Sequence, residues 1–411
     1  MRIFFLILVF ISGVLAAVEN EKVFWKGQVR MRGEAKENTD YNHHKGDATS
    51  YAFSRFRLGV GTEMSGVLPW DIYFEPQYVK IWGRKEDGSS QTSTTGTSTS
   101  TSGGTHDSRI DAHQAFITLK PSDIWAIKLG RQELIYGEHL LIGNIDWNPA
   151  GRSFDALKIS HKGWGGTTDA FLSKLAENNQ SSPGPGDDYF YGIYHAMTME
   201  KGVKNLDFYV LDKSITSINE DLLTVGVRAK SYIGILDYRL EYSPQWGRFI
   251  AGKRQQGEYQ LDFELGLSFF AKKMRLAGEY FASSEDFDQL YPTAHRWLGY
   301  ADQFARRNID GFAIHESLQF LQKGFFDIDF QSFYRNDKKA PAYNFSGAAL
   351  GTVGNSNHIA DEIDFTFKYP VGGFDFLVGY SMVIPQAYLY DQNSLQNSVT
   401  QWGYIQFNTK F

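Results

Sequence analysis

The segment YQLDFELGLSF, residues Tyr259–Phe269, alternates large apolar residues strictly with polar ones. An alternation with a period of two is the signature of a β-strand that has one apolar and one polar face. The same alternation recurs in three further segments, at residues 236–242, 326–335 and 362–369. The sequence therefore predicts an all-β protein built from many amphipathic strands.

The length of these segments distinguishes a membrane barrel from a soluble β-sandwich. They run for about 10–13 residues, enough for a tilted strand to cross a bilayer, whereas strands of globular proteins usually have about 5–6. The last segment places Ile405, Phe407 and Phe411 on one face, and a terminal aromatic residue on such a strand is typical of outer-membrane barrels. We expect a transmembrane antiparallel β-barrel in the bacterial outer membrane, in contact with outer-membrane lipid. We also expect the barrel-assembly machinery to recognise the strand that ends at Phe411.

Composition and the first residues fit an exported protein. The chain of 411 residues has 40 glycines, 32 phenylalanines and no cysteine, which excludes disulfides, thiolate metal sites and cysteine nucleophiles. Its net charge of -6 gives no overall attraction to nucleic acid. Arg2 followed by an apolar run and small residues ending at Ala16 predicts a signal peptide over residues 1–16. Residues 17–411 are then predicted to form a single barrel domain.

The connections between the segments alternate between short and long. Short turns such as Val371–Gly373 are expected on the periplasmic side, and long polar connections such as 136–153 and 283–311 on the extracellular side. The count favours about 18 strands, and 16 remain possible because region 154–235 shows poor alternation. The Ser/Thr/Gly-rich stretch 88–108 is predicted to be an outer loop.

A barrel of 16–18 strands leaves an aqueous passage, lined by the polar face of each strand. The first two strands are expected to pair and to gather their cations on one wall of this passage. Arginine presents forked donors that match carboxylates and phosphates, so this wall favours anions. The candidate basic residues of the lumen are Lys26, Arg30, Arg32, Arg55, Arg57, Arg228, Arg239 and Arg335. Acidic residues on the same faces leave open a general diffusion porin without anion selectivity.

Two segments resemble a known family. They are Gly130–Ile159, GRQELIYGEHLLIGNIDWNPAGRSFDALKI, and Phe287–Phe312, FDQLYPTAHRWLGYADQFARRNIDGF. Both are similar to signature segments of the alginate export family of outer-membrane porins. The resemblance implies an 18-stranded monomeric barrel, and the namesake of the family passes an anionic uronate polysaccharide through an arginine-rich lumen. It also adds Arg131 and Arg152 to the candidate cargo-binding residues.

Several details of these segments stay open from the sequence. Strict alternation directs Arg131 towards lipid unless Gly130 forms a bulge that turns it. Asp146 and Asp155 either belong to the polar core of the family signature or simply shape the loop. In the second segment, aromatic and basic residues form either a sugar-stacking lip or a packed outer loop; they are Tyr291, His295, Trp297, Tyr300, Arg306 and Arg307.

We therefore predict a passive porin for anionic sugars, oligosaccharides, uronate-like polysaccharide or small organic acids, with no cofactor, no metal and no enzymatic activity. The namesake exporter has a long periplasmic plug loop, and the short turns here favour passive diffusion instead. Two other classes make different predictions. An outer-membrane enzyme requires serine, histidine and acid groups within hydrogen-bond reach, although no GxSxG or HExxH motif is present. A receptor barrel requires a lumen blocked by inward loops.

Overall fold

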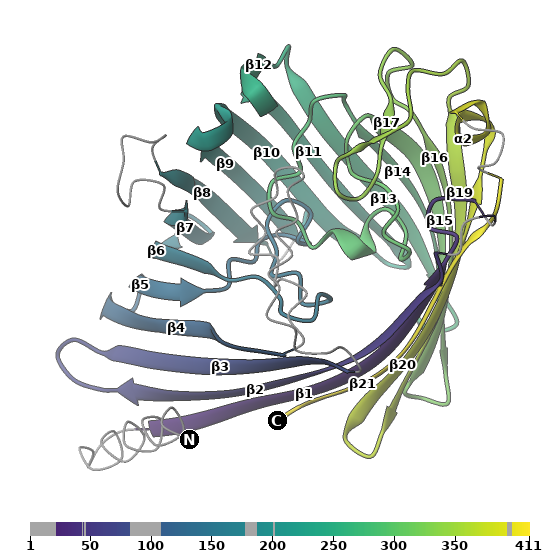
Figure 1. Cartoon of the computed structure of the whole chain (residues 1–411). Helices are drawn as coiled ribbons and strands as arrows, with labels where there is room; N and C mark the ends of the chain where they lie inside the picture. The colour runs from purple at the N-terminus through teal and green to yellow at the C-terminus, as the bar shows by residue number, and fades with distance from the viewer. Residues whose placement is uncertain are drawn as a thin grey trace.

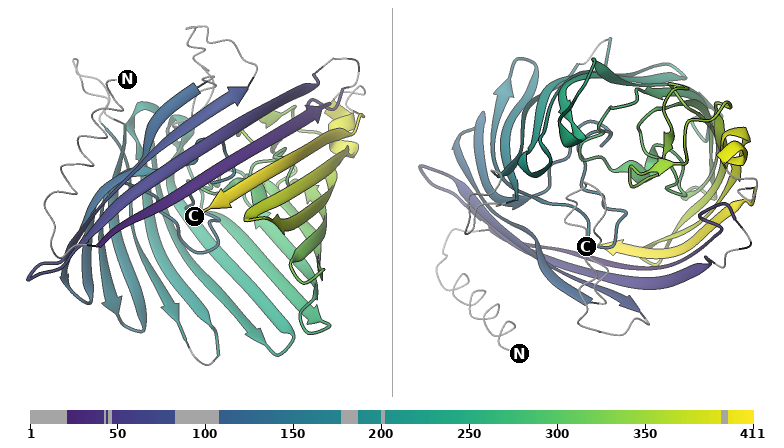
Figure 2. Two further views of the ribbon diagram at one scale, coloured as in Figure 1. Left: turned by 90° about the horizontal axis from the view of Figure 1, so that it is seen from below. Right: turned by 45° about the horizontal axis from the view of Figure 1, so that its top comes forward.

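The computed structural model describes residues 22–42, 44, 47–82, 108–176, 187–199, 202–392 and 397–411. The predicted signal peptide and almost all of the stretch 88–108 lie outside these residues. The described chain is a closed antiparallel barrel of 18 strands (Figure 1; Figure 2). Strand β21 pairs with β1 from Gln28–Lys410 to Glu37–Gln401 and so closes the cylinder. No helix among the described residues is long and apolar enough to cross a membrane.

The strands of the barrel wall follow one another in chain order. They are β1 (Lys22–Glu37), β2 (Thr49–Met64), β3 (Trp70–Trp82), β4 (Ser108–Ser122), β5 (Trp125–Gln132), β6 (Phe154–Gly163), β7 (Gly166–Ala176), β8 (Asp188–Thr198), β9 (Asn205–Ile215), β10 (Glu220–Ile233), β11 (Leu236–Phe249), β13 (Glu258–Phe269), β14 (Met274–Ser283), β15 (Ile309–Phe320), β16 (Gly324–Tyr334), β19 (His358–Val371), β20 (Phe374–Pro385) and β21 (Thr400–Lys410). Three short strands and a short helix lie at the long-loop end: β12 (Lys253–Arg254), β17 (Ala342–Tyr343), β18 (Ala349–Leu350) and α2 (Ala387–Gln392). The described residues also form the 3-10 helices η1 (Thr216–Ile218), η2 (Ile250–Gly252) and η3 (Ala294–Arg296).

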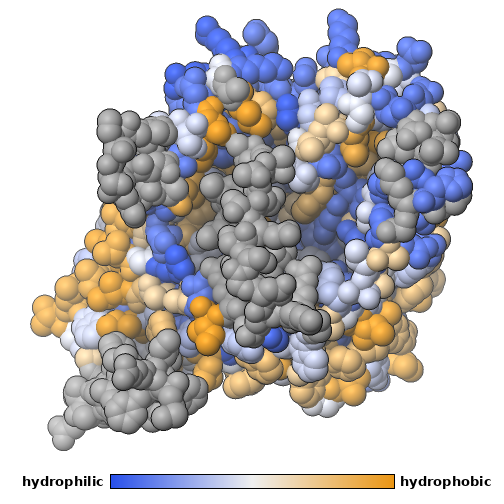
Figure 3. Space-filling model, viewed as in Figure 1, coloured by the Kyte–Doolittle hydropathy of each residue, from blue (hydrophilic) through white to orange (hydrophobic). Residues whose placement is uncertain are grey.

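The outer face of the barrel is apolar, as the alternation predicts. Phe263 and Leu265 of β13 are 40% and 43% exposed, and Phe407 of β21 is 47% exposed, whereas Asp262 points inward and is fully buried. Figure 3 shows hydrophilic residues gathered at the rim of the long loops and hydrophobic ones over the sides below it. Side chains exposed in this manner match lipid acyl chains, so the predicted orientation of the strands is confirmed.

The connections confirm short periplasmic turns and long extracellular loops, with one departure. Residues 372–373 join β19 to β20, and residues 123–124 join β4 to β5. At the long-loop end, however, β9 and β10 are joined by residues 216–219 alone, which form a single 3-10 turn. Alternation is weak in this region because the inner faces of β6–β9 carry aromatic side chains.

Two extracellular loops fold back into the barrel. We call residues 133–153, between β5 and β6, loop A, and residues 284–308, between β14 and β15, loop B. The two loops meet at a parallel bridge between Ile142 and Tyr291. The Gly143 backbone N–H donates to the Tyr291 carbonyl at 2.8 Å, and the Thr293 N–H donates to the His139 carbonyl at 2.9 Å. The right-hand view of Figure 2 shows coil within the ring of strands.

Candidate functional site

Two cavities lie inside the barrel, one on each side of residues 144–149 in loop A. The larger one, the outer cavity, has a volume of about 920 Å³ and extends to Lys36 and Tyr51 near the extracellular end of the first two strands. The smaller one, the inner cavity, has a volume of about 420 Å³ and is bordered by Lys26 and Lys410 near the periplasmic end.

Residues 144–149 separate the two cavities. Ile145 and Trp147 line the outer cavity, whereas Asn144 and Asp146 line the inner one. The side chains of residues 144–147 thus alternate between the two cavities, and Asn148 and Pro149 line the outer one. We call residues 144–149 the partition.

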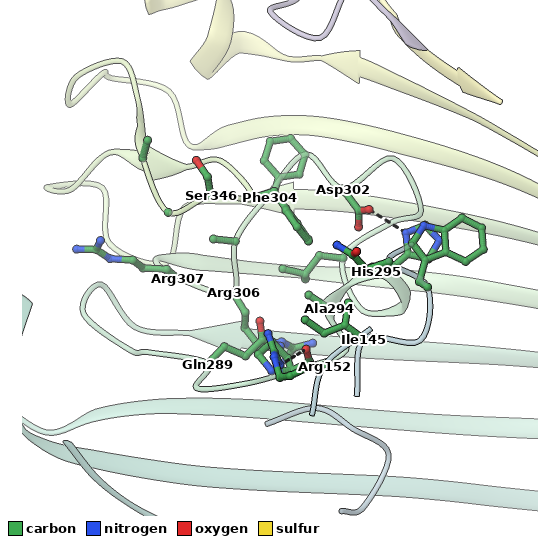
Figure 4. Close-up of a pocket in the computed structure, with 18 of the residues that line it drawn as sticks. Ile145, Arg152, Gln289, Ala294, His295, Asp302, Phe304, Arg306, Arg307 and Ser346 are labelled. Carbon is green, nitrogen blue, oxygen red and sulfur yellow. Dashed lines mark hydrogen bonds and ion pairs between the residues drawn. The ribbon is translucent and has the colours of Figure 1, made fainter. Parts of the chain in front are cut away.

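Figure 4 shows the outer cavity from within. Arg152 and Gln289 lie together on one side of it, and His295 is joined to Asp302 on another. The His295–Asp302 contact measures 2.9 Å.

Three arginines of β1 and β2 hold the partition. The register pairs Arg30 with Arg55 and places Arg57 opposite Gln28, so the three guanidinium groups lie side by side on the inner face. Arg30 and Arg55 contact the Asp146 carboxylate at 2.9 and 2.6 Å, and Arg57 approaches it at 3.4 Å. We call this group the arginine clamp. Charged hydrogen bonds of this kind are among the strongest in proteins.

The clamp also binds backbone carbonyls of loop A, within the partition and next to it. Arg55 donates to the carbonyls of Asp146 and Asn148 at 3.2 and 3.1 Å, and Arg57 donates to the Ala150 carbonyl at 3.0 Å. Burial alone would raise the pKa of Asp146, but Arg55, Arg30 and Arg57 outweigh it and hold that pKa well below its usual range. The carboxylate is therefore ionised at neutral pH.

Arg32 continues the basic wall towards the outer cavity. Its guanidinium lies 3.8 Å from the centre of the Trp147 ring and donates to the Trp147 carbonyl at 2.9 Å. Glu34 pairs with it at 2.6 Å. The opposite face of Trp147 contacts the His295 ring at 3.9 Å, so the partition and loop B share a stack of rings.

The wall formed by β6–β9 carries aromatic side chains on its inner face. We call the buried inward aromatic side chains of β6–β9 the aromatic wall; they are Phe154, Phe171, Phe190, Tyr194 and Tyr209. Leu134 and Ile142 of loop A and Tyr291 of loop B pack against it. This packing buries apolar surface of both loops and fixes them inside the barrel.

A second ionic contact joins loop A to the wall next to β9. Arg228 of β10 contacts Glu138 of loop A at 2.7 Å and Asp207 of β9 at 2.6 Å. Lys230 also reaches Glu138, at 2.8 Å. Burial alone would raise the pKa of Glu138, but Lys230 and Arg228 lower it to about 2. Arg228 is therefore inward-facing, as predicted, and holds a loop.

Arg239 faces inward among acids of its own wall. It contacts Asp262, Glu264 and Glu279 at 2.9, 3.0 and 3.3 Å. Its neighbours compensate its charge, and Asp262 also pairs with Arg306 of loop B at 2.8 Å. Here the acidic residues solvate and neutralise the basic ones.

Arg131 departs from the predicted lumen position. It lies on the outer face with Leu129, which is 56% exposed, and pairs with Asp155 through two contacts of 2.9 Å. Gly130 has a φ of 124°, but the pairing of Arg131 with Asp155 stays in register and no bulge turns the side chain inward.

Arg152 and Lys26 border the two cavities. Arg152 donates to the carbonyls of Gly143 and Pro292 at 3.4 and 3.1 Å, and burial lowers its pKa to about 10. Lys26 lies 5.5 Å from the centre of the Phe24 ring. Neither cation has a carboxylate partner within salt-bridge distance in the described part of the chain.

Arg335 differs from its expected role. It lies just beyond β16, is fully buried, and donates to four backbone carbonyls of the next loop, including those of Ala340 and Ser356 at 2.8 and 2.6 Å. Its distance from both cavities makes it a loop anchor. In loop B, Tyr291, Trp297 and Arg306 are at most 6% exposed, so these residues are packed and do not form an open sugar-stacking lip.

Two groups of a serine, a histidine and an acid come within hydrogen-bond reach among the described residues. In one, Ser332 Oγ of β16 lies 3.1 Å from His358 Nε2, which lies 2.9 Å from Asp361 of β19. The other lies at the ends of loop A. His113 Nδ1 lies 3.2 Å from Ser153 Oγ, and His113 Nε2 lies 2.9 Å from Glu133. Arg57 approaches the same Nδ1 at 3.4 Å, and Ser153 lines neither of the two cavities. We therefore interpret the group as a support for the ends of loop A.

The sequence reasoning missed the inward course of loops A and B. The signal was present as the apolar run Leu140–Ile142 and as Phe287, Leu298 and Phe304, which are too hydrophobic for solvated loops. It also missed Glu138, whose role depends on Arg228 from a strand distant in sequence.

The fold resembles porins of known structure. OccK2 (OpdF) of Pseudomonas aeruginosa, solved in complex with glucuronate, matches with a TM-score of 0.65 and 10% identity over 96% of this chain and 98% of that chain. OccK8 (OprE) of the same organism gives 0.65 and 12%, again over 96% and 98%. OccAB1 of Acinetobacter baumannii gives 0.66 and 11% over 96% and 97%. At these identities the similarity concerns the fold.

The sequence itself gives the family. A search of curated proteins finds no match. The family model described as alginate export matches residues 25–385, which is most of the chain and includes loops A and B. With the 18-stranded barrel, this makes the protein an outer-membrane channel of the porin type. The chain belongs to the alginate export family.

Proposed function

We propose that this channel passes small anionic sugars of the uronate type by passive diffusion. The observation that carries the proposal is a path of cations that lack carboxylate partners in the described residues. Lys36 and Arg152 border the outer cavity, and Lys26 and Lys410 border the inner one. Lys36 donates to the Ala301 carbonyl at 2.7 Å, so its charge is not compensated there.

The outer cavity supports a sugar as well as an anion. Its volume of about 920 Å³ falls within the range of about 300–1,000 Å³ that is usual for small-molecule sites. Tyr51, Trp147 and Trp402 line it beside Arg32 and Lys36. Aromatic rings contact the apolar faces of sugars, and arginine binds their carboxylates. The glucuronate complex of the structurally similar OccK2 is consistent with such a cargo.

A general diffusion porin is the main alternative, and the opposing acidic residues motivate it. Three of the inward acids of the wall argue against it, because Asp262, Glu362 and Asp364 are fully buried. Asp262 pairs with arginines, and Glu362 accepts the Ala301 N–H of loop B at 2.8 Å. These three acids are thus not exposed to the aqueous path, whereas Lys26 and Lys36 border the cavities.

Planar bilayers test the proposal. Sodium glucuronate added on the extracellular side is expected to reduce the chloride current in a concentration-dependent manner, and glucose is expected to have no such effect. Equal effects of glucuronate and glucose, with no anion preference in reversal potentials, would establish the general diffusion porin instead.

A receptor barrel would also have inward loops, and the same recording separates it from a channel. A receptor is expected to bind ligand without steady current. Export directed by residues 1–16, a single domain over 17–411, a monomeric state, lipid contact and recognition of the last strand by the assembly machinery stay predictions.

A further inference from the structure

The arginine clamp differs from the other inward arginines in where its acid comes from. Arg239 is neutralised by Asp262 and Glu264, which belong to strands of the wall. The acid that the clamp contacts is Asp146, which belongs to a loop. An acid on a loop can leave its partners without breaking any pairing between strands.

The clamp holds more positive charge than its acid supplies. Three guanidinium groups share the single carboxylate of Asp146, and the nearest strand partner of Arg57 is the neutral Gln77, at 2.8 Å. The side chain of Arg55 is completely buried and those of Arg30 and Arg57 are 7% exposed. A solute cannot reach Arg55 while Asp146 occupies the site.

Asp146 itself is open to the aqueous path. Its side chain retains 30% exposure, and it lines the inner cavity together with Lys26 and Lys410. An anion in the lumen can therefore approach the carboxylate and its arginines from the side.

We infer that Arg30, Arg55 and Arg57 form a carboxylate-binding site for which Asp146 is the resident ligand, and that the carboxylate of a passing sugar acid takes its place. This inference rests on the proposed function and adds how the cargo itself would regulate its passage. Displacement of Asp146 releases the partition from β1 and β2, while the aromatic wall keeps the rest of loop A in place. The partition then opens for the solute that displaced it.

The expected effect follows from competition. A tethered carboxylate acts at an effective concentration in the millimolar range or above, so its removal raises the apparent affinity for free carboxylate. In single-channel recordings, Asp146→Asn is expected to strengthen block by glucuronate about ten-fold or more and to increase the preference for chloride over potassium. Asp155→Asn is the matched control, because Asp155 pairs with Arg131 on the outer face.

A second measurement does not need Asp146 to be changed. The chain has no cysteine, so a single thiol can be labelled selectively. Ala150 is 9% exposed, and its carbonyl is held by Arg57. Labelling of Ala150→Cys by a small thiol reagent is expected to accelerate in glucuronate and not in glucose. Ala156→Cys, on the inner face of β6, is expected to show no acceleration.

The outcomes separate the two proposals. If glucuronate blocks the wild-type channel and Asp146→Asn changes neither block nor chloride preference, the resident-ligand inference is wrong and the proposed function stands. If glucuronate does not act on the wild-type channel but Asp146→Asn raises chloride preference, the clamp is an anion site and the uronate cargo is wrong. Unchanged labelling of Ala150→Cys in a channel that glucuronate blocks would likewise overturn the inference.

Discussion

The two walls that hold loop A do so by different physical means. On β1 and β2, arginines contact a carboxylate and backbone carbonyls of loop A. On β6–β9, aromatic side chains pack against apolar residues of the same loop. Another anion can replace a charged contact in water, whereas a hydrophilic solute cannot replace apolar packing. This difference predicts that the aromatic wall stabilises the loops and that the arginine clamp contributes to selectivity.

The largest expected effect comes from a substitution that disrupts the packing of the aromatic wall. Phe190 of β8 is fully buried and contacts the Tyr291 ring of loop B at 4.8 Å. Phe190→Ala is expected to lower the free energy of unfolding by about 3–5 kcal/mol, because truncating a buried phenylalanine leaves a cavity. Urea unfolding of the purified barrel in lipid vesicles measures the change. Chloride preference should be kept in the channels that remain folded.

Phe208 of β9 is the matched control for this substitution. It is 47% exposed on the outer face, so Phe208→Ala removes a lipid contact and leaves the inner packing intact. A loss of stability as large as that of Phe190→Ala would contradict the role given to the aromatic wall.

The next largest effect is a change in anion preference, expected when the arginine clamp is removed and the aromatic wall is left unchanged. Replacing Arg30, Arg32, Arg55 and Arg57 together by glutamine removes four cations from the path and is expected to reduce the preference for anions substantially. Reversal potentials in a potassium chloride gradient measure this. Arg131→Gln, on the outer face, should leave the reversal potential unchanged. An unchanged preference in the quadruple variant would remove the basic wall from the selectivity mechanism.

The same contrast explains which part of the molecule could be predicted from sequence. On β1 and β2 the inner face is charged, so alternation placed Arg30 and Arg55 in the lumen beside one another, as the register of the strands has them. On β8 the inner face carries Phe190 and Tyr194, and the outer face carries Ile193, so both faces are apolar and the period of two is hidden.

Pairing between a loop and a distant strand is equally hidden from sequence. The contact of Asp146 with Arg55 joins residues 91 positions apart, and loop geometry decides it. For Arg131, strand alternation and the family resemblance made different predictions. Alternation directed its side chain outward, and the resemblance suggested a place in the lumen. The structure has the side chain on the outer face. Strand periodicity was thus the better guide at that position.

A smaller effect on stability is expected at the second ionic contact of loop A, and it separates the contribution of charge from that of packing. Glu138→Gln removes the loop acid that Arg228 and Lys230 share, at 2.7 and 2.8 Å. It lies beside the aromatic wall, so loop A should remain packed and the free energy of unfolding should fall by about 1–3 kcal/mol, less than in Phe190→Ala, since Asp207 still pairs with Arg228. Urea unfolding measures this loss, and a loss equal to that of Phe190→Ala would show that charge, and not packing, holds the loop there.

The smallest expected effect is the pH dependence of chloride preference, which depends on the ionisation of Asp146 in the clamp. The pKa of Asp146 is lower in the folded protein than its usual value of about 4. The carboxylate is therefore ionised and bound by the arginines above about pH 4, and this contact is lost as the pH falls through the lowered pKa. Arg55, Arg30, Arg57 and Lys410 are the charged groups that lower this pKa. The difference in chloride preference between the wild type and Asp146→Asn should therefore stay constant from about pH 8 to 5 and diminish only below about pH 4. Reversal potentials measured across this range test the argument, because a difference that already changes between pH 8 and 5 would require a different titrating group to control the partition.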